Sequence, residues 1–405
     1  MITYDTSSLN IEKLERLSAQ SVLTYFSDIA IDFVATLAST IQKTATLYYS
    51  PEMQAMAFWM RKSHLLALKQ KYQEIDPNII RVGHGTVFHI APSNVDSIFF
   101  YSWFISLLSG NKNIVRISNK TLHHLRPFLN LIDGLLKDPK FVSIAQRNML
   151  VSYDRDDEIT ALLSKKAQFR VIWGGDATIE HIRQISIPAS AKELTFANKF
   201  SLAIIHADFY VQSTATEKET LMRQFYNDAY WFGQQACSSP RLTCWVGAED
   251  MISVAQTDFW SQLDHYLASQ DHAISLANIS DKIFTMQAIA MKDESSRLIT
   301  TETTQLISRI LITDLNLLAK AWHCGSGLFF EYKTTDLHTI MEFLALDVQT
   351  ISYYGLTQST LQQAYLTHLP PGGVRFVPIG QALNFHEVWD GYDLFSAFSK
   401  RIYFC

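Results

Sequence analysis

The spacing of apolar residues along this 405-residue chain changes near Gly85. Before that point the apolar positions follow a helical period, as at Phe26 and Ile29. Ser50-Pro51-Glu52 predicts the start of a helix that continues to about Gln73. A capping hydroxyl, a proline in the first turn and an acid near the positive helix end each favour a helix start there. The first 75 residues are therefore expected to be helical.

After Gly85, short apolar strands alternate with helical segments, which is typical of a parallel α/β sheet with right-handed crossovers. Helices are expected at Val95–Leu108, Leu122–Leu136, Glu158–Lys165, Ala177–Ile187 and Glu217–Phe232. The strands of the first block are expected at Thr86–Ala91, Ile114–Ile117, Met149–Tyr153 and Phe169–Trp173. Those of the second are expected at Leu202–Ile205, Leu242–Val246, Ile310–Leu315, Leu328–Tyr332 and Thr350–Tyr354.

Three segments follow from this pattern. Residues 1–196 are predicted to hold the N-terminal helices and a Rossmann-like, parallel-sheet nucleotide-binding domain, and residues 197–370 an α/β catalytic domain that contains a cysteine. Pro370-Pro371-Gly372-Gly373 interrupts the chain once more. Residues 371–405 are expected to pack on the cofactor domain or on a neighbouring subunit.

Composition excludes several classes of function. The chain is 18% charged and 48% hydrophobic with a net charge of -5, so it has no basic surface for nucleic acid. The most apolar window, Ile98–Leu108, is too short to span a membrane, and no secretory signal precedes it. The four cysteines have no CxxC spacing, which argues against a metal site or disulfide framework and favours the reducing cytosol.

Cys237 is the leading candidate for a nucleophile. It lies between the helix predicted to end at Phe232 and the strand Leu242–Val246. A thiol on a turn near a helix end can be partly exposed and can reach a carbonyl carbon. A lone cysteine is more often a buried core residue, so this interpretation depends on the flanking residues and on the motifs that follow.

Three strand ends are candidates for nucleotide binding, although no GxGxxG fingerprint is present. The first is Ala91-Pro-Ser-Asn94. The second carries Arg116 and Ser118, a cation and a hydroxyl on one face of a strand, which suit a ribose or a phosphate. The third is Trp173-Gly174-Gly175-Asp176-Ala-Thr178, whose glycines allow close approach of a ligand to a helix N-terminus. The alternative is that these residues only cap helices and form tight turns.

Together these motifs resemble the aldehyde dehydrogenase superfamily, and within it the LuxC-type long-chain acyl-CoA reductases of bacterial luminescence. The resemblance spans about Gly83 to Arg401. It is carried by Ala91–Asn94, Ser109-Gly-Asn111 with Arg116, Trp173–Gly175, Gln234-Gln-Ala-Cys237, Cys324-Gly-Ser-Gly-Leu-Phe329, Val377-Pro-Ile-Gly380 and Trp389-Asp-Gly-Tyr-Asp393.

The resemblance implies roles for several residues. Cys237 matches the catalytic cysteine, Asn94 the asparagine that stabilises the oxyanion, and Arg116 with Ser118 the contacts to the adenosine ribose. The acidic residue often found after that serine is Asn119 here. Because a carboxylate there would repel a 2′-phosphate, Asn119 favours NADPH over NADH, with Arg116 and Lys120 attracting the extra charge. No metal is implied.

Two departures bear on the reaction. Thr195 falls where hydrolytic aldehyde dehydrogenases carry their glutamate base, with Glu193 two residues away, and the second superfamily glutamate has no convincing match. Without a water-activating base, the resemblance implies NADPH-dependent reduction of a fatty acyl-CoA, or of an acyl-protein thioester, to the aldehyde. A homo-oligomer and an acyl-protein synthetase partner are also implied. The alternatives are a CoA-independent aldehyde dehydrogenase and a non-catalytic scaffold subunit of a fatty acid reductase complex.

Overall fold

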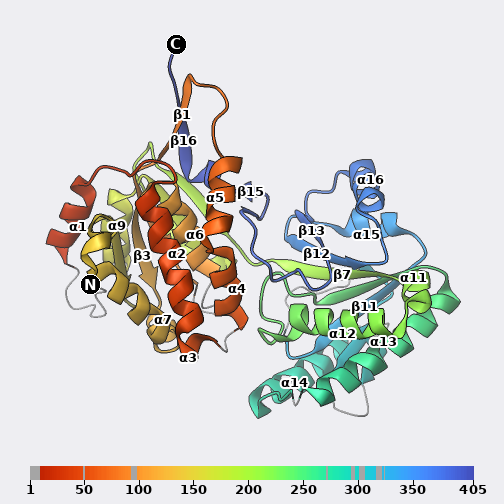
Figure 1. Ribbon diagram of the computed structural model, residues 1–405. Helices are drawn as coiled ribbons and strands as arrows, with labels where there is room; N and C mark the ends of the chain where they lie inside the picture. The colour runs from red at the N-terminus through yellow and green to blue at the C-terminus, as the bar shows by residue number, and fades with distance from the viewer. Residues whose placement is uncertain are drawn as a thin grey trace. The chain divides into compact units, whose positions relative to one another are not determined.

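The computed structural model describes residues 10–48, 51–92, 98–270, 272–292, 297–300, 306–315, 322 and 324–405. The chain forms two compact units, shown in Figure 1. Unit 1 comprises residues 1–198 and 385–405, and unit 2 comprises residues 199–384. The C-terminal segment from Phe385 therefore belongs to the same unit as the N-terminal helices.

Unit 1 is built on a five-stranded parallel sheet with the strand order β4-β3-β2-β5-β6. The chain runs outward from β2 through β3 to β4 and then returns to the other side of β2. That reversal is the switch point at which parallel sheets bind ligands. The strands are β2 (Thr86–Ile90), β3 (Lys112–Ile117), β4 (Asn148–Ser152), β5 (Phe169–Trp173) and β6 (Lys192–Phe196).

Helices cover this sheet, and their apolar residues bury its faces. The helix α6 (Ile98–Leu108) is buried throughout its described side chains, which fits its uninterrupted apolar sequence. The other helices are α1 (Ile11–Ala19), α2 (Asp28–Lys43), α3 (Ala45–Tyr48), α4 (Pro51–Trp59), α5 (Lys62–Lys71), α7 (Asn119–Lys137), η1 (Pro139–Phe141), α8 (Val142–Ala145), α9 (Asp157–Lys166), α10 (Asp176–Arg183) and α17 (Leu394–Ala397).

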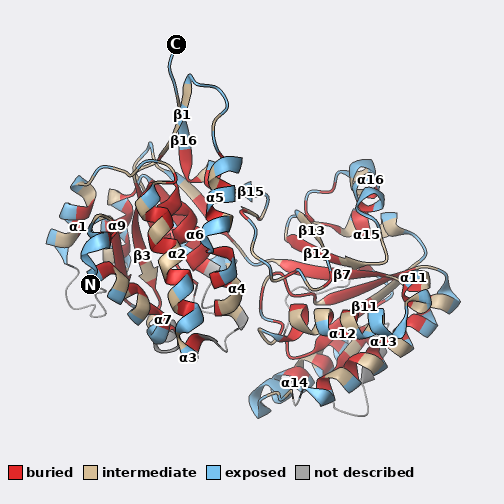
Figure 2. Ribbon diagram, viewed as in Figure 1, coloured by how far each residue is buried: buried red, intermediate tan, exposed pale blue. Residues whose placement is uncertain are grey.

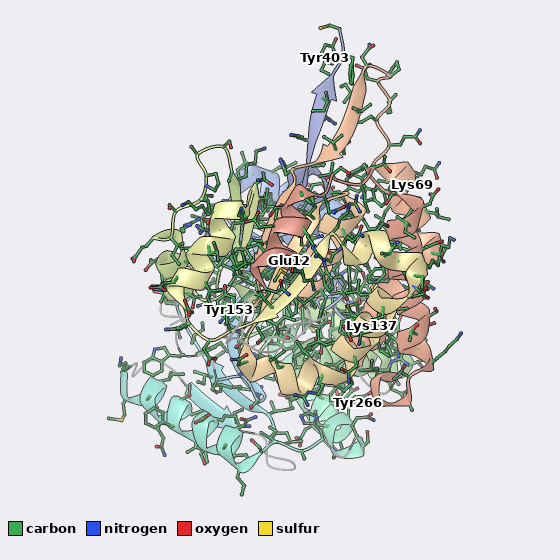
Figure 3. All side chains as sticks on the ribbon, turned by 90° about the vertical axis from the view of Figure 1, so that its left-hand side faces the viewer. Glu12, Lys69, Lys137, Tyr153, Tyr266 and Tyr403 are labelled. Atoms are coloured by element: carbon green, nitrogen blue, oxygen red, sulfur yellow. The ribbon has the colours of Figure 1, made fainter. Side chains whose placement is uncertain are left out.

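Two small antiparallel pairs complete unit 1. The strands β1 (Ile79–Gly83) and β16 (Ser399–Tyr403) form a ribbon that projects from the helices, with Tyr403 labelled near its tip in Figure 3. The second pair is β14 (Val388–Trp389) with β15 (Tyr392–Asp393). The Trp389–Asp393 motif therefore forms a tight hairpin, whose turn residues Asp390 and Gly391 have positive φ angles.

Unit 2 is built on a seven-stranded sheet with the order β13-β12-β7-β8-β11-β10-β9, in which only the edge strand β9 is antiparallel. Figure 2 shows its central strands as buried. The strands are β7 (Phe200–His206), β8 (Leu242–Val246), β9 (Arg297–Thr300), β10 (Ser308–Leu311), β11 (Leu328–Thr334), β12 (Val348–Tyr354) and β13 (Arg375–Pro378). The helices are α11 (Ala207–Gln212), α12 (Ala215–Tyr230), α13 (Glu249–Ser269), α14 (Leu276–Lys292), α15 (Leu337–Phe343) and α16 (Gln358–His368).

The structure corrects two of the expected elements. The helix predicted from Pro51 to Gln73 is broken into α4 and α5, because Arg61 takes an extended conformation as the N-cap of α5. The strand expected at Ile310–Leu315 is β10, which begins at Ser308 and ends at Leu311.

Candidate active site

Cys237 lies on the connection between α12 and β8 in unit 2, and its side chain is half-buried. The helix expected to end at Phe232 is α12, and Cys237 lies on the turn that follows it, before β8. The helix α12 ends at Tyr230, and Gly233 and Gln234 then take positive φ angles of 56° and 64°. These left-handed residues turn the chain away from the helix axis before it reaches the thiol.

The turn that carries Cys237 is fixed at both ends by one residue of β7. The Ser201 hydroxyl donates to the Cys237 carbonyl at 2.6 Å, and the Ser201 carbonyl accepts from the Arg241 amide at 2.9 Å. The same hydroxyl accepts from the Thr350 amide of β12 at 3.1 Å. Because β7 and β12 are neighbouring buried strands, the five-residue turn Cys237–Arg241 is attached to the rigid centre of the sheet.

Gln234, which precedes the turn, holds it against the start of β11. Its side chain is buried, and its amide nitrogen donates to the carbonyls of Pro240 at 2.9 Å and Leu328 at 3.0 Å. Its amide oxygen accepts from the Gly327 amide at 3.1 Å. All three partners are backbone groups, so Gln234 joins the cysteine turn to the start of β11 whatever side chains surround it.

Replacing Gln234 by glutamate is expected to loosen the cysteine turn. A carboxylate has nearly the same shape but cannot donate to the two carbonyls, and the variant is expected to lose about 2 kcal/mol of unfolding free energy. We also expect alkylation of Cys237 to change in rate. Urea unfolding and iodoacetamide labelling measure the two effects. Gln235→Glu is the matched control, because Gln235 is exposed and its side chain donates to the Cys324 carbonyl. Equal losses in both variants would contradict the assigned role.

Arg241 places a positive charge beside the thiol. Burial lowers the pKa of Arg241 to about 10, while the nearby Cys237 acts in the opposite direction. The Arg241 Nε is buried without a hydrogen-bond partner. A guanidinium that remains charged there favours the thiolate over the thiol electrostatically. The sequence pattern does not single out this arginine, although it stands only four residues after Cys237.

The loop that begins with the Val377–Gly380 motif is held by a buried acid. Asp228 accepts from the amides of Gly380 at 2.7 Å and Ala382 at 3.0 Å. Its own carbonyl accepts from the Ser239 hydroxyl at 2.7 Å, inside the cysteine turn. Asp228 therefore links this loop to the turn that carries the thiol.

In unit 1, Arg116 and Ser118 lie at the carboxyl end of β3, as predicted. The Arg116 guanidinium donates to the Tyr153 carbonyl at 3.0 Å and lies 5.2 Å from the centre of the Tyr153 ring. Burial lowers the pKa of Arg116. Its Nε has no hydrogen-bond partner, so a donor remains unsatisfied at this edge. Such an orphaned buried donor fits a nucleotide oxygen at the strand ends.

Gly174, Gly175 and Thr178 form one strand-to-helix turn between β5 and α10. A Cβ at Gly174 would lie 3.2 Å from Thr178 Cγ2, and one at Gly175 would lie 3.3 Å from Asn198 Nδ2. Both glycines therefore have a packing reason as well as the predicted ligand-facing one. The turn ends β5, which is the neighbour of β2 at the switch point of the sheet.

The remaining candidates divide into three cases. Asn94 lies outside the described residues. Glu193 is held by Arg170 at 2.7 Å and Arg183 at 3.0 Å, so it has a structural role in unit 1. Thr195 accepts only a long bond from Arg183 at 3.5 Å.

Two buried or half-buried histidines of unit 1, His84 and His89, have structural roles. His89 is fully buried against Asn113 and Ser102, and burial lowers its pKa to about 4. His84 contacts the Ala397 carbonyl at 3.0 Å. Neither histidine lies in the unit that carries Cys237.

The described residues were searched for two further features, a metal site and a membrane-spanning helix. Among them, no group of three or more metal-ligating side chains converges. Their helices are also too short or too polar to cross a lipid bilayer.

Comparison with known proteins identifies the family. A family model described as acyl-CoA reductase (LuxC) matches residues 63–296, which is more than half of the chain. The chain belongs to the LuxC acyl-CoA reductase family. A search of curated proteins finds no match. The match includes Cys237, Arg116, Ser118 and the Gly174–Gly175 turn.

Solved structures show that the LuxC chain has the aldehyde dehydrogenase fold. A lactaldehyde dehydrogenase matches with a TM-score of 0.61 and 13% identity, over 97% of this chain and 86% of that one. An NAD-dependent benzaldehyde dehydrogenase from Corynebacterium glutamicum matches with a TM-score of 0.64 and 10% identity, over 97% and 87%. The bifunctional proline utilization A protein matches with a TM-score of 0.66 and 12% identity, over 97% of this chain, which spans only 46% of that larger protein.

The family identifies an enzyme of the oxidoreductase kind, an acyl-CoA reductase. The predicted family and fold class are thereby confirmed. The individual roles of Cys237, Asn94, Arg116, Ser118, Asn119, Gly174, Gly175 and Thr178 stay predictions.

Proposed function

We propose that this LuxC-family chain reduces a fatty acyl-CoA, or an acyl-protein thioester, to the aldehyde through an acyl intermediate on Cys237, with NADPH as the preferred reductant. The observation that carries the proposal is the half-buried Cys237 thiol on a turn fixed by Ser201 and Gln234, with the Arg241 cation beside it. A fixed, electropositive and accessible thiol is what attack on a thioester carbonyl requires.

The chemistry begins with transfer of the acyl group. The Cys237 thiolate attacks the thioester carbonyl, the carbon–sulfur bond to CoA breaks, and the CoA thiolate leaves and takes up a proton. The Cys237 amide and the Asn94 side chain are the proposed donors to the oxyanion, each worth about 3 kcal/mol in comparable sites. Because Ser201 and Gln234 fix the turn before substrate arrives, little reorganisation is needed during the reaction.

NADPH, when bound, supplies the hydride that takes the acyl carbon to the aldehyde level. The chain's own part is then to release the product: the carbon–sulfur bond to Cys237 breaks, the aldehyde leaves, and the thiolate is restored beside Arg241. Arg116, Ser118 and the Gly174–Gly175 turn are proposed to hold the nucleotide. Thr195 stands at the position of the hydrolytic glutamate and cannot act as a carboxylate base, which supports reduction over hydrolysis.

The assay that tests the proposal uses the full chain with fatty acyl-CoA of several chain lengths and either NADPH or NADH. We expect aldehyde to form with matching loss of reduced nicotinamide and release of CoA, and little free fatty acid. Oxidation of aldehydes with no requirement for CoA would favour the alternative aldehyde dehydrogenase activity. Aldehyde formation that needs an added acyl-protein synthetase would assign the acyl-protein as the donor.

The quaternary arrangement is also part of the proposal. We propose a homo-oligomer in the cytoplasm, with the C-terminal segment in contact with a neighbouring subunit through the β1–β16 ribbon. Within unit 1 this ribbon has only two strands, with exposed apolar residues at Ile80 and Tyr403. Isolated two-stranded ribbons are rarely stable without further packing, which supports a partner there.

A further inference from the structure

The carboxyl ends of β3 and β4 bring together two polar residues that are far apart in the sequence. These strands are parallel neighbours, with Ile117 paired to Ser152 at their ends. Asn119 follows β3 and Asp154 follows β4, so both lie at the same edge of the sheet. This edge also carries Arg116, the residue proposed to hold the cofactor's adenosine ribose.

Hydrogen bonds fix how Asn119 is oriented. Its amide oxygen accepts a short hydrogen bond from the Ser152 hydroxyl. Its amide nitrogen donates to Asp154 Oδ1 at 2.9 Å. Since the Ser152 hydroxyl also donates to the Ile117 carbonyl at 3.0 Å, it shares its hydrogen between two acceptors at the strand end. The amide therefore presents its nitrogen to the exposed Asp154 carboxylate.

Asp154 therefore places a negative charge at the edge of the sheet where β3 itself is followed by the neutral Asn119. Asn119 stands after β3 at the position where the superfamily resemblance implies an acid, and this difference is the reason to expect NADPH. The Asp154 carboxylate reaches the same place from the next strand. It also acts electrostatically on Arg116, where it opposes the effect of Arg155. A 2′-phosphate bound by Arg116 would therefore meet a carboxylate as well as a guanidinium.

We propose that Asp154 determines the choice between NADPH and NADH: its carboxylate accepts from a ribose 2′-hydroxyl and repels a 2′-phosphate. The inference rests on the proposed function in one respect, that the cofactor's adenosine ribose binds at this edge. It follows that the proposed preference of the wild-type chain for NADPH is small, with dissociation constants for NADPH and NADH within about tenfold of each other, because Arg116 and Asp154 act in opposite directions.

Nucleotide binding to Asp154→Asn, without acyl substrate, tests the inference. Dissociation constants for NADPH and NADH are measured by the change in nicotinamide fluorescence. We expect NADPH to bind about tenfold more tightly and NADH no more tightly than in the wild type, because one nearby negative charge is removed. Asn119→Asp adds a charge at the same edge and is expected to weaken NADPH by about the same factor.

Asp157→Asn is the matched control. It removes the same charge from an exposed residue of α9 whose partner is His181, at 2.9 Å. We expect the ratio of the two dissociation constants to stay at the wild-type value. If both nucleotides bind but Asp154→Asn leaves that ratio unchanged, or if Asp157→Asn changes it equally, the assignment of Asp154 is overturned. If neither nucleotide binds the folded wild-type chain, the proposed cofactor site itself is wrong and the inference fails with it.

Discussion

Replacing Cys237 by serine is expected to lower the rate of aldehyde formation by about four orders of magnitude or more. A serine hydroxyl is not ionised near neutral pH, so the positive charge of Arg241 has no anion to stabilise at that position. The variant should also lose the first half-reaction. When acyl-CoA is added without reductant, the wild type should release a stoichiometric burst of CoA and acquire the mass of one acyl group, whereas Cys237→Ser should do neither.

A second cysteine provides the control for that experiment. Cys405 is exposed at the end of the chain, so Cys405→Ser should retain both the burst and the acyl adduct. The Cys237→Ser variant must still unfold cooperatively, as judged by far-ultraviolet circular dichroism against urea. Full aldehyde production by a folded Cys237→Ser variant would contradict the covalent mechanism. Acylation of Cys237 without any reduction would leave the chain as an acyl carrier rather than a reductase.

The fold was largely predictable because its signals are local. The strands β2, β3, β5 and β8 are short apolar runs bounded by polar or glycine residues, and each was placed within two residues of its observed bounds. The edge strand β6 (Lys192–Phe196) was not predicted as a strand. It carries charged residues whose partners, Arg170 and Arg183, come from other elements. Strands of this kind become recognisable only when their neighbours in space are known.

The candidate site was predictable in its components but not in its arrangement. The motif indicates Cys237 but not the role of Gln234, because the positive φ of Gln234 and its three backbone partners are properties of the folded turn. Similarly, the expectation of NADPH from Asn119 takes account only of residues on and after β3. The contact with Asp154, 35 residues away, arises from the pairing of β3 with β4. Conclusions about charge at a sheet edge therefore need the neighbouring strand as well.

The largest effect on stability is expected at Glu331, a fully buried acid on β11. Its Oε1 accepts from the Trp245 indole at 2.9 Å and the Trp260 indole at 2.6 Å. The same oxygen accepts from the Gln256 amide at 3.0 Å, and Oε2 accepts from Arg309 at 3.2 Å. One carboxylate therefore satisfies donors from β8, α13 and β10.

Replacing Glu331 by alanine is expected to lower the free energy of unfolding by about 3 to 5 kcal/mol, since it leaves a mostly buried guanidinium and three N–H donors without their acceptor. Glu331→Gln keeps an oxygen for the indoles and should lose about 1 to 2 kcal/mol. Glu219→Ala, at an exposed position of α12, is the control and should stay within about 0.5 kcal/mol of the wild type. Urea unfolding followed by tryptophan fluorescence reports directly on Trp245 and Trp260. If Glu331→Ala is as stable as Glu219→Ala, the carboxylate does not join α13 to the sheet of unit 2, and the indole and guanidinium donors must find acceptors elsewhere in the folded chain.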